Sequence, residues 1–456
     1  MPDQFDAIII GADQPGSVLA ARLAGAGRRV ALVGPGQPGA GDASTPIQAL
    51  AASARRAWSA RQAARFGVVL DGPVTVDMEA VKARKDAIVA AATAALADRL
   101  ARFPSLAFVR GEAHFLSPTE VKVGRRRLSA PQIFINTGTS ASVPPWPGIK
   151  SVPYLTSSSM MNLDSMPDHL IIVGAGHVGL EFAHIYTRLG AKVTVISRGP
   201  RALSAEDADI SAAIRTMLEA EGVTFMFGTT LEAVARAGHG VLLSLRSGKR
   251  LASIEGSHLL VATGRRPDTD ALNLAAAGLE ADDTGFIPVD DHLRTAVPGI
   301  WALGGVTGRG AGIQTSCSDC EMVADNLLDG GQRSIAGRIP VCGLFIDPPL
   351  GRIGMTEARL RQSGRKALIA TMPMTEAPRA RDRGETQGLM KILVDAASRR
   401  ILGAAILGIG GDEVVQSLLP AMAAGTPYTA LMATTHIHPT VTSHLPTLLA
   451  RLKPLR

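Results

Sequence analysis

Three glycines with the spacing Gly-x-Gly-x-x-Gly lie between two apolar runs near the middle of the chain. Gly174, Gly176 and Gly179 follow the β-rich run 169–173 and open a segment with helical periodicity. The first glycine permits a tight turn, the second lets the backbone approach a pyrophosphate, and the third lets helix and strand pack closely. The pattern therefore predicts that a dinucleotide binds at the helix N-terminus. A glycine-rich turn without a ligand is the alternative.

The residues that follow this unit favour NADPH over NADH. A carboxylate normally stands at the end of the second strand when the ligand is NAD, because it hydrogen-bonds the ribose 2′-hydroxyl. Here Ser197 occupies that position, and Arg198 and Arg201 follow it. Guanidinium groups bind phosphate oxygens well, so we expect these three residues to line the 2′-phosphate. Arginines on a solvated surface are the alternative interpretation.

Cys317 and Cys320 form a C-x-x-C pair. Such a pair at a helix N-terminus can have lowered thiol pKa values and can act as a redox pair. The alternative is that both are small buried residues without chemistry. A zinc site built with Cys342 and a histidine is weakly supported, because one C-x-x-C lacks the second ligand pair of a structural zinc site. We predict no metal.

The chain contains two units in which a strand, a glycine turn, a helix and a second strand follow one another. One unit holds the Gly-x-Gly-x-x-Gly motif described above, and the other holds a related glycine motif. They span Phe5–Val33, with a strand at Ala7–Ile10, and His169–Ser197. Such βαβ units form parallel sheets, so the fold class is α/β with two nucleotide-binding domains. After about Arg338 the pattern changes to alternating strands followed by helices, which predicts a separate α+β domain.

Composition narrows the class of protein. The chain has 456 residues, 46% hydrophobic and 19% charged, a net charge of +7 and three cysteines. This length predicts two to four domains, and the few cysteines argue against a disulfide-stapled secreted protein. Arginines are scattered without interleaved aromatics, and no apolar run reaches the length of a membrane span. We expect a soluble, cytoplasmic protein with no nucleic-acid or membrane partner.

The order of the motifs resembles the pyridine nucleotide-disulfide oxidoreductases, especially the mercuric-reductase-like and dihydrolipoamide-dehydrogenase-like branch. Besides the two βαβ units, the resemblance rests on four segments, which are Leu259–Thr269, Thr295–Gly305, Asp347–Glu357 and His436–Thr440. It implies a homodimer and adds Gly264 and Arg265 to the NADP site. The implied domains are an FAD-type domain in two segments (1–150 and 267–336), an NADP-binding domain (151–266) and a dimerisation domain (337–456).

The sequence departs from this family where dithiol chemistry would occur. The family places two cysteines in the segment that here reads Gly39–Leu50, and neither is present. Ser44 stands at the second cysteine, and Gln48 replaces the lysine that pairs with the glutamate matching Glu181. Serine forms neither a disulfide nor a thiolate, so we predict that this segment carries no dithiol chemistry.

The candidate proton donors also follow from the resemblance. His438 is retained and would be contributed across the dimer interface, but Ser443 stands where the family has an acid that orients it. His436 lies nearby. His177 occupies the slot of a tyrosine that shields the flavin, and Glu181 lies one turn further on the same helix. Without the lysine, we expect the pKa of Glu181 to be raised.

Three FAD contacts of the family are altered. In the first fingerprint, Gly11-x-Asp13-x-x-Gly16, a carboxylate stands where the backbone would touch the pyrophosphate. Gly34 stands where an acid would bind the adenosine ribose, and Gly305 replaces an aspartate that would bind the ribityl chain. Whether FAD is bound is therefore left open.

These observations predict an NADPH-dependent oxidoreductase that works without thiols. Hydride would pass from NADPH to a small organic acceptor in the space that the isoalloxazine occupies in the family. One alternative is a thiol-free, FAD-dependent reductase, oxidase or transhydrogenase. Another is an NADPH-binding regulatory protein without turnover.

Overall fold

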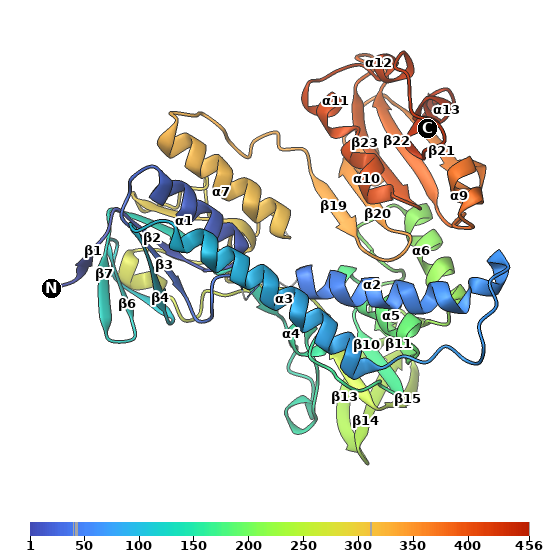
Figure 1. Cartoon of the computed structure of the whole chain (residues 1–456), viewed down its shortest axis with the longest axis horizontal. Coiled ribbons are helices and arrows are strands. Elements are labelled where there is room, and N and C mark those ends of the chain that lie inside the picture. Colours follow the sequence, from blue (N-terminus) through green and yellow to red (C-terminus); the bar gives the residue numbers. More distant parts are fainter. Residues whose placement is uncertain (40, 42–43, 311, 456) are drawn as a thin grey trace. The chain divides into compact units, whose positions relative to one another are not determined.

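The protein is described by a computed structural model that covers residues 1–39, 41, 44–310 and 312–455. The chain divides into two compact units. Unit 1 comprises residues 1–49, 82–142 and 264–338, and unit 2 comprises residues 50–81, 143–263 and 339–456. Two long helices, α2 (Ser44–Arg61) and α3 (Met78–Ala101), each contain residues of both units (Figure 1).

A five-stranded parallel sheet is the centre of unit 1. Its strand order is β18-β8-β2-β3-β4. The bounds are Ile300–Ala302 for β18, Gln132–Ile135 for β8, Ala7–Ile10 for β2, Val30–Gly34 for β3 and Leu106–Arg110 for β4. Helices α1 (Gln14–Gly25) and α7 (Ile313–Leu328) pack side by side, as Figure 1 shows.

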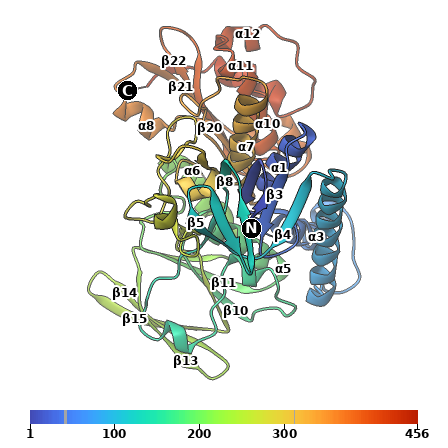
Figure 2. The same cartoon turned by 90° about the vertical axis from the view of Figure 1, so that its left-hand side faces the viewer.

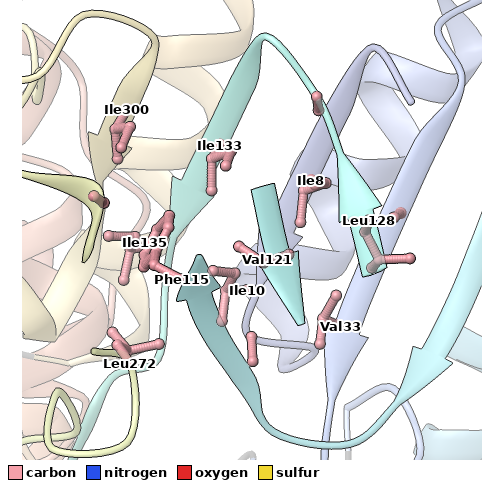
Figure 3. Close-up of a cluster of buried hydrophobic side chains, with 14 of the residues drawn as sticks. Ile8, Ile10, Val33, Phe115, Val121, Leu128, Ile133, Ile135, Leu272 and Ile300 are labelled. Carbon is pink, nitrogen blue, oxygen red and sulfur yellow. The ribbon is translucent and has the colours of Figure 1, made fainter. Parts of the chain in front are cut away.

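The two faces of this sheet bury alternate residues, as the two-residue period of a strand requires. Ile9, Leu32 and Phe134 belong to one buried cluster with residues of α1 and α7. Ile8 and Ile10 face the other way, into a second cluster that Figure 3 shows. That cluster includes side chains of a mixed sheet with the order β1-β7-β6-β5, in which β1 pairs parallel with β7 and the other pairs are antiparallel. Its strands are Asp3–Gln4, Arg126–Ser129, Glu120–Val123 and Ala113–Ser117.

The rest of unit 1 is a two-stranded sheet and short helical turns. Strands β9 (Thr139–Ala141) and β17 (Arg265–Pro267) pair antiparallel. The turns η3 (Leu274–Ala277) and η4 (Gly304–Thr307) precede and follow β18.

Unit 2 contains a second parallel sheet, with the order β12-β11-β10-β16. Its strands are Thr224–Phe227, Lys192–Ser197, His169–Val173 and His258–Val261. Helix α5 (His177–Leu189) connects β10 to β11 and packs on both, and α6 (Ala208–Ala220) connects β11 to β12. Antiparallel strands β13, β14 and β15, drawn together in Figure 2, span Thr230–Ala237, Gly240–Ser247 and Arg250–Gly256.

The C-terminal part of unit 2 is a six-stranded sheet with the order β19-β20-β23-β22-β21-β24, whose pairs are all antiparallel. The strands are Val341–Leu344, Leu350–Gly354, Ile401–Leu407, Leu389–Asp395, Ala367–Pro373 and Lys453–Pro454. Its helices are α8 (Glu357–Gln362), α9 (Pro378–Asp382), α10 (Gly411–Gln416), α11 (Leu419–Ala423), α12 (Tyr428–Met432) and α13 (Leu445–Leu449).

The structure confirms both predicted βαβ units and the change of pattern after Arg338. Strand β2 covers the predicted residues Ala7–Ile10, and the second unit runs from β10 to the end of β11 at Ser197. Within the described ranges, none of the helices is both long and apolar enough to cross a membrane.

Candidate active site

The turn between β10 and α5 has the geometry that the second fingerprint predicts. Gly174 has φ of +122°, and a Cβ there would lie 2.1 Å from the carbonyl oxygen of Ala262. A Cβ at Gly179 would lie 2.0 Å from the carbonyl oxygen of Gly174, so helix and turn are in contact. Gly176 caps α5, and a Cβ there meets no atom within 4 Å among the described residues. The backbone N–H groups that open α5 are therefore accessible to an anion.

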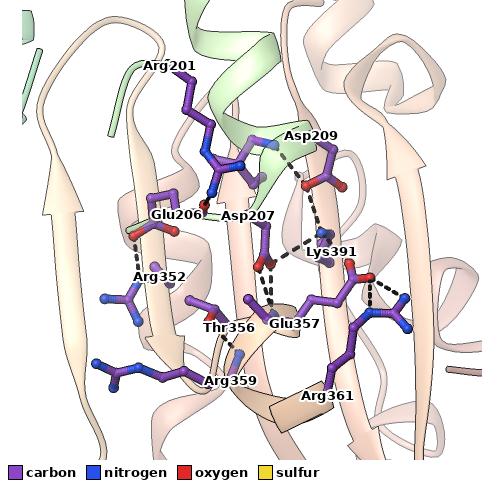
Figure 4. Close-up of polar contacts among 12 residues, drawn as sticks. Arg201, Glu206, Asp207, Asp209, Arg352, Thr356, Glu357, Arg359, Arg361 and Lys391 are labelled. Atoms are coloured by element: carbon purple, nitrogen blue, oxygen red, sulfur yellow. Dashed lines mark hydrogen bonds and ion pairs between the residues drawn. The ribbon is translucent and has the colours of Figure 1, made fainter. Parts of the chain in front are cut away.

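The residues predicted to bind the 2′-phosphate are the last residue of β11, Ser197, and two arginines that follow this strand. Arg198 is exposed, and Ser197 accepts a hydrogen bond from the N–H of Gly199 at 3.2 Å. Arg201 Nη2 donates to the carbonyl oxygens of Ser204 and Glu206, both at 3.1 Å (Figure 4). Its Nε is buried and has no hydrogen-bond acceptor in the described part of the chain. Arg201 thus shapes this loop and keeps one unsatisfied donor.

Gly264 and Arg265 belong to unit 1. The Gly264 carbonyl oxygen accepts from the N–H of Ser142 at 3.0 Å. Arg265 Nε donates to Thr139 Oγ1 at 2.6 Å, and its Nη2 donates to the Thr139 carbonyl oxygen. These bonds join β17 to β9, and a role for either residue at the NADP site stays a prediction.

Glu181 lies on the buried face of α5, where it is 8% exposed. Its Oε1 accepts a hydrogen bond from the backbone N–H of Phe345 at 2.9 Å. Burial raises the pKa of Glu181 to about 7, although the Phe345 hydrogen bond acts in the opposite direction. The rise agrees with the expectation from the sequence, and burial is its main cause.

Glu181 is one of three side chains that fasten α5 to the segment 345–347. The N–H of Asp347 donates to His184 Nδ1 at 3.2 Å, and Arg188 Nη2 donates to the Asp347 carbonyl oxygen at 2.8 Å. Positions i, i+3 and i+7 lie on one face of a helix, so the three bonds hold one chain segment along one face. Arg188 also binds Glu221, with 2.7 Å between Nε and Oε2.

His177, the first residue of α5, is paired with Cys342 of β19. The distance from His177 Nε2 to Cys342 Sγ is 3.0 Å. Burial lowers the pKa of His177 and raises the pKa of the Cys342 thiol. Both groups are therefore neutral at pH 7, and a neutral imidazole is a weaker proton donor than Glu181. No local sequence pattern links His177 to Cys342, since 165 positions separate the two residues.

Arg352 lies opposite Cys342 in the β19–β20 ladder. Its Nε donates to Glu206 Oε1 at 2.7 Å (Figure 4). Glu206 is 4% exposed, and its Oε2 has no hydrogen-bond partner among the residues described. Burial raises the pKa of Glu206, and Arg352 lowers it. The side chains thus form a series that begins with the imidazole of His177 at the start of α5. The thiol of Cys342, the guanidinium of Arg352 and the carboxylate of Glu206 come next in this order.

A buried lysine fixes the loop that follows Arg201. Lys391 of β22 is 2% exposed, and its Nζ lies 3.3 Å from Asp207 Oδ2, 2.7 Å from Asp209 Oδ1 and 2.9 Å from Glu357 Oε2 (Figure 4). Asp207 also accepts from the N–H of Glu357 at 3.1 Å. Burial lowers the pKa of Lys391, but the hydrogen bonds that Lys391 donates to Asp209 and Glu357 outweigh this effect, so the pKa is raised. No local sequence signal marked this cluster.

The two C-terminal histidine candidates lie in the segment 434–440. His436 Nε2 contacts Thr434 Oγ1 at 3.2 Å and the Leu431 carbonyl oxygen at 3.1 Å, so its ring is held by its own loop. His438 is exposed. Ser443 Oγ donates to the Thr440 carbonyl oxygen at 2.7 Å. The Nε2 of His444 is buried and has no hydrogen-bond partner in the described ranges.

In the first fingerprint, Asp13 occupies the N-terminus of α1 with its own side chain. Asp13 Oδ1 accepts from the N–H of Gly16 at 3.3 Å and from Asn136 Nδ2 at 2.8 Å. Asn136 Oδ1 in turn accepts from Ser316 Oγ at 2.9 Å. The donors that would bind a pyrophosphate here already bind a carboxylate.

The other two altered FAD positions are sterically restricted. A Cβ at Gly34 would lie 2.6 Å from Ala12 Cβ, so an acidic side chain there requires a shift of the turn. A Cβ at Gly305 would lie 3.2 Å from Thr139 Cγ2. Together with Asp13, these positions lack the side-chain contacts to FAD that the family resemblance implies.

The remaining predicted residues concern thiol chemistry. Ser44 and Gln48 lie on α2, and no thiol is present there. Cys317 and Cys320 lie on α7, and among the described residues none of the three cysteines forms a disulfide. Burial, with nearby Asp13 and Asp319, raises the pKa of the Cys320 thiol well above its usual range. A buried neutral thiol is a weak nucleophile. Among the described residues, no group of three or more potential ligands could hold a metal ion.

Comparison with known proteins identifies relatives over the whole chain. The probable pyridine nucleotide-disulfide oxidoreductase RclA of Escherichia coli is 32% identical over 99% of this chain and its own full length. A mercuric reductase of Streptomyces lividans is 32% identical over 97% of this chain and 94% of its own. The solved structure titled HOCl-induced flavoprotein disulfide reductase RclA from Escherichia coli has a TM-score of 0.88 over 98% of this chain and 99% of its own, at 32% identity.

The family assignment agrees with these relatives and with the predicted fold class. Residues 5–320 match the family described as pyridine nucleotide-disulphide oxidoreductase, and residues 340–449 match its dimerisation domain. The chain therefore belongs to the pyridine nucleotide-disulphide oxidoreductase family.

Proposed function

We propose that this protein is an NADPH-dependent oxidoreductase that reduces a small acceptor without a dithiol. The observation that carries the proposal is on α5, where an accessible helix N-terminus and a carboxyl group with a pKa of about 7 lie one turn apart. The first feature suits the pyrophosphate of a dinucleotide, and the second suits a proton donor near neutral pH.

The residues after β11 support NADPH as the reductant. Ser197 leaves the ribose end without a carboxylate, Arg198 is exposed, and Arg201 Nε lacks an acceptor among the described residues. Guanidinium groups bind a 2′-phosphate through charge-assisted hydrogen bonds. The Lys391 cluster holds this loop in place through Asp207 and Asp209.

NADPH, when bound, supplies a hydride. Glu181 supplies the proton that completes the reduction, so the acceptor gains a hydride and a proton, which together are two electrons and two protons. Glu181 becomes a carboxylate and takes a proton back from solvent. With a pKa of about 7, about half of the Glu181 side chains carry this proton at neutral pH. The bond from the Phe345 N–H orients the carboxyl group.

The test is NADPH oxidation by the purified protein with a panel of enones, imines, quinones and carbonyl compounds. Hg(II) and Cu(II) salts belong in the panel, because relatives are a mercuric reductase and an RclA whose structure is a Cu(II) complex. Glu181→Gln keeps an acceptor for the Phe345 N–H but holds no titratable proton. We expect kcat to fall about a hundredfold with little change in KM.

The matched control is Glu219→Gln, which changes an exposed carboxylate of α6 that pairs with Arg215. It should leave kcat and KM unchanged. An acceptor that wild type and Glu181→Gln reduce at equal rates would contradict the role of Glu181. Saturable NADPH binding with no turnover across the panel would favour the regulatory alternative.

A thiol-free flavin enzyme is the second candidate. The observation that favours it is Thr137 Oγ1, which is buried next to the first fingerprint and has no partner in the described ranges. The visible absorbance of the protein as isolated separates the two candidates. Stoichiometric yellow flavin would support the second candidate and contradict the first.

A homodimer is part of the proposal, because the family's dimerisation domain covers residues 340–449. His438, on an exposed loop of this domain, would then reach the partner's site. Native mass determination checks the assembly.

A further inference from the structure

The two fingerprint turns of this chain have the same backbone geometry. Gly11 has φ of +125°, against +122° for Gly174. A Cβ on Gly11 would lie 2.1 Å from the Asn136 carbonyl oxygen, and a Cβ on Gly174 would lie 2.1 Å from that of Ala262. The third glycines match as well, with 2.0 Å from the added Cβ to the first glycine's carbonyl oxygen in each turn. Any difference in ligand preference must therefore come from side chains.

Two side chains distinguish the turns. At the middle glycine position, Asp13 caps α1, whereas Gly176 caps α5 and offers no side-chain acceptor among the described residues. At the end of the neighbouring strand, Asn136 stands where the other turn has Ala262. The Asn136 amide donates to Asp13 Oδ1 at 2.8 Å. The second difference therefore reinforces the first.

The Asn136 amide is itself held in position. Asn136 is 1% exposed, and Ser316, which donates to its Oδ1 at 2.9 Å, is 7% exposed. The amide cannot turn its donor elsewhere without losing this bond. Asp13 Oδ1 thus receives one bond from the backbone N–H of Gly16 and one from a fixed side chain.

A carboxylate in this position does what a bound phosphate would do. It places a negative charge at the positive end of α1 and accepts a backbone N–H that would otherwise have no partner. A pyrophosphate approaching the same N–H groups would meet the charge of Asp13 at close range. Binding would require the carboxylate to leave the Gly16 N–H and the Asn136 amide.

We infer that Asp13, Asn136 and Ser316 form an internal anion that closes the first fingerprint to pyrophosphate, so that the chain binds one dinucleotide where its fold has places for two. Asp13 is the specificity-determining residue, and Asn136 and Ser316 position it. The inference concerns unit 1 and does not depend on the acceptor or on Glu181.

The test titrates the full-length protein with FAD and follows the flavin fluorescence. Asp13→Gly should bind FAD at least about tenfold more tightly than the wild type, because it removes the charge and frees the Gly16 N–H. Asp13→Asn keeps an oxygen that can cap α1 but removes the charge, and should give an intermediate affinity. Thermal unfolding of each variant checks that it is folded.

Two results would overturn the inference. One is a wild-type protein that binds FAD as tightly as Asp13→Gly. The other is Asp13→Asn with the affinity of the wild type, because the effect would then not be one of charge. Altered contacts at Gly34 and Gly305 weaken FAD binding equally in all these proteins, so the ratios remain interpretable.

The reciprocal substitution tests whether a carboxylate at the helix N-terminus also weakens dinucleotide binding in unit 2. Gly176→Asp places a carboxylate at the N-terminus of α5 and should weaken NADPH binding at least about tenfold. Unchanged NADPH affinity would overturn the electrostatic basis of the inference. If the wild-type protein bound no NADPH, the proposed function would fail, whereas the FAD titrations would still decide the role of Asp13.

Discussion

The surroundings of α1 and α5 differ in how completely their polar groups are satisfied. Around α1, Asp13, Asn136 and Ser316 bind one another. Around α5 and the loop after β11, Glu206 Oε2 and Arg201 Nε lack partners among the described residues. Buried polar groups are nearly always paired in native proteins. The unpaired atoms of Glu206 and Arg201 therefore support the proposed ligand site near α5.

A carboxyl group of α5 also has a shifted pKa. Glu181 of α5 has a pKa raised to about 7 because it is buried with one hydrogen bond from Phe345. Perturbed pKa values concentrate at functional sites. In unit 1, the buried hydroxyl oxygen of Thr137 also has no hydrogen-bond partner in the described part of the chain. The comparison teaches that a glycine fingerprint sets the shape of a turn, while neighbouring side chains decide whether it accepts a ligand.

The largest expected effect comes from removing the positive charge of Lys391. Lys391→Met leaves Asp207, Asp209 and Glu357 without their shared cation, and we expect a loss of about 3–5 kcal/mol in the free energy of unfolding. Denaturant unfolding measures it. Lys366→Met, at an exposed position, is the control. A loss of about 1 kcal/mol or less would mean that the cluster contributes little.

A pH-dependent stability difference should follow from Glu181. Its folded-state pKa of about 7 exceeds the ordinary value of 4.5, so the folded protein prefers the protonated form. The contribution of protonated Glu181 to the free energy of unfolding should be fully present below about pH 4.5. This contribution should be lost as the pH rises through 7. Glu181→Gln has no such loss. The free energy of unfolding of this variant, relative to that of the wild type, should therefore increase by about 3 kcal/mol between pH 4.5 and pH 8. Parallel unfolding curves at both pH values would contradict the shifted pKa.

The choice of dinucleotide depends on the arginines after β11. Arg198→Ala should weaken NADPH binding about tenfold or more and leave NADH binding unchanged, because one charge-assisted contact contributes about 1.5–3 kcal/mol. Isothermal titration with each nucleotide measures the ratio. Arg215→Ala, which changes an exposed arginine of α6, is the control. Equal losses for both nucleotides would remove Arg198 from the 2′-phosphate site.

The smallest effect concerns the closed turn. Ser316→Ala removes one buried hydrogen bond to Asn136 and should lower the free energy of unfolding by about 1 kcal/mol without changing NADPH affinity. Ser318→Ala, on the same helix, is the control. If Ser316→Ala weakened NADPH binding, the first turn would affect the second, and the prediction that the two turns act independently would be wrong.

Much of the fold could be predicted because its signals are local. The glycine spacing and the apolar runs predicted both βαβ units, and the structure confirms them with β2 at Ala7–Ile10 and α5 opening at His177. The site was predicted in part. Glu181 and the fingerprint glycines were singled out, but the pairing of His177 with Cys342 and the Lys391 cluster were not, since their members come from distant segments.

By itself, the sequence determined where two glycine turns form, that the first carries Asp13, and that residues 39–50 contain no cysteine. These properties depend on residue types and on spacings of a few positions. Only the tertiary structure decided what these residues contact. Asp13 meets Asn136 across 123 positions, Glu181 meets Phe345 across 164, and Lys391 meets Asp207 across 184. Burial and partners at such separations are properties of packing, and they set the charge state of each group.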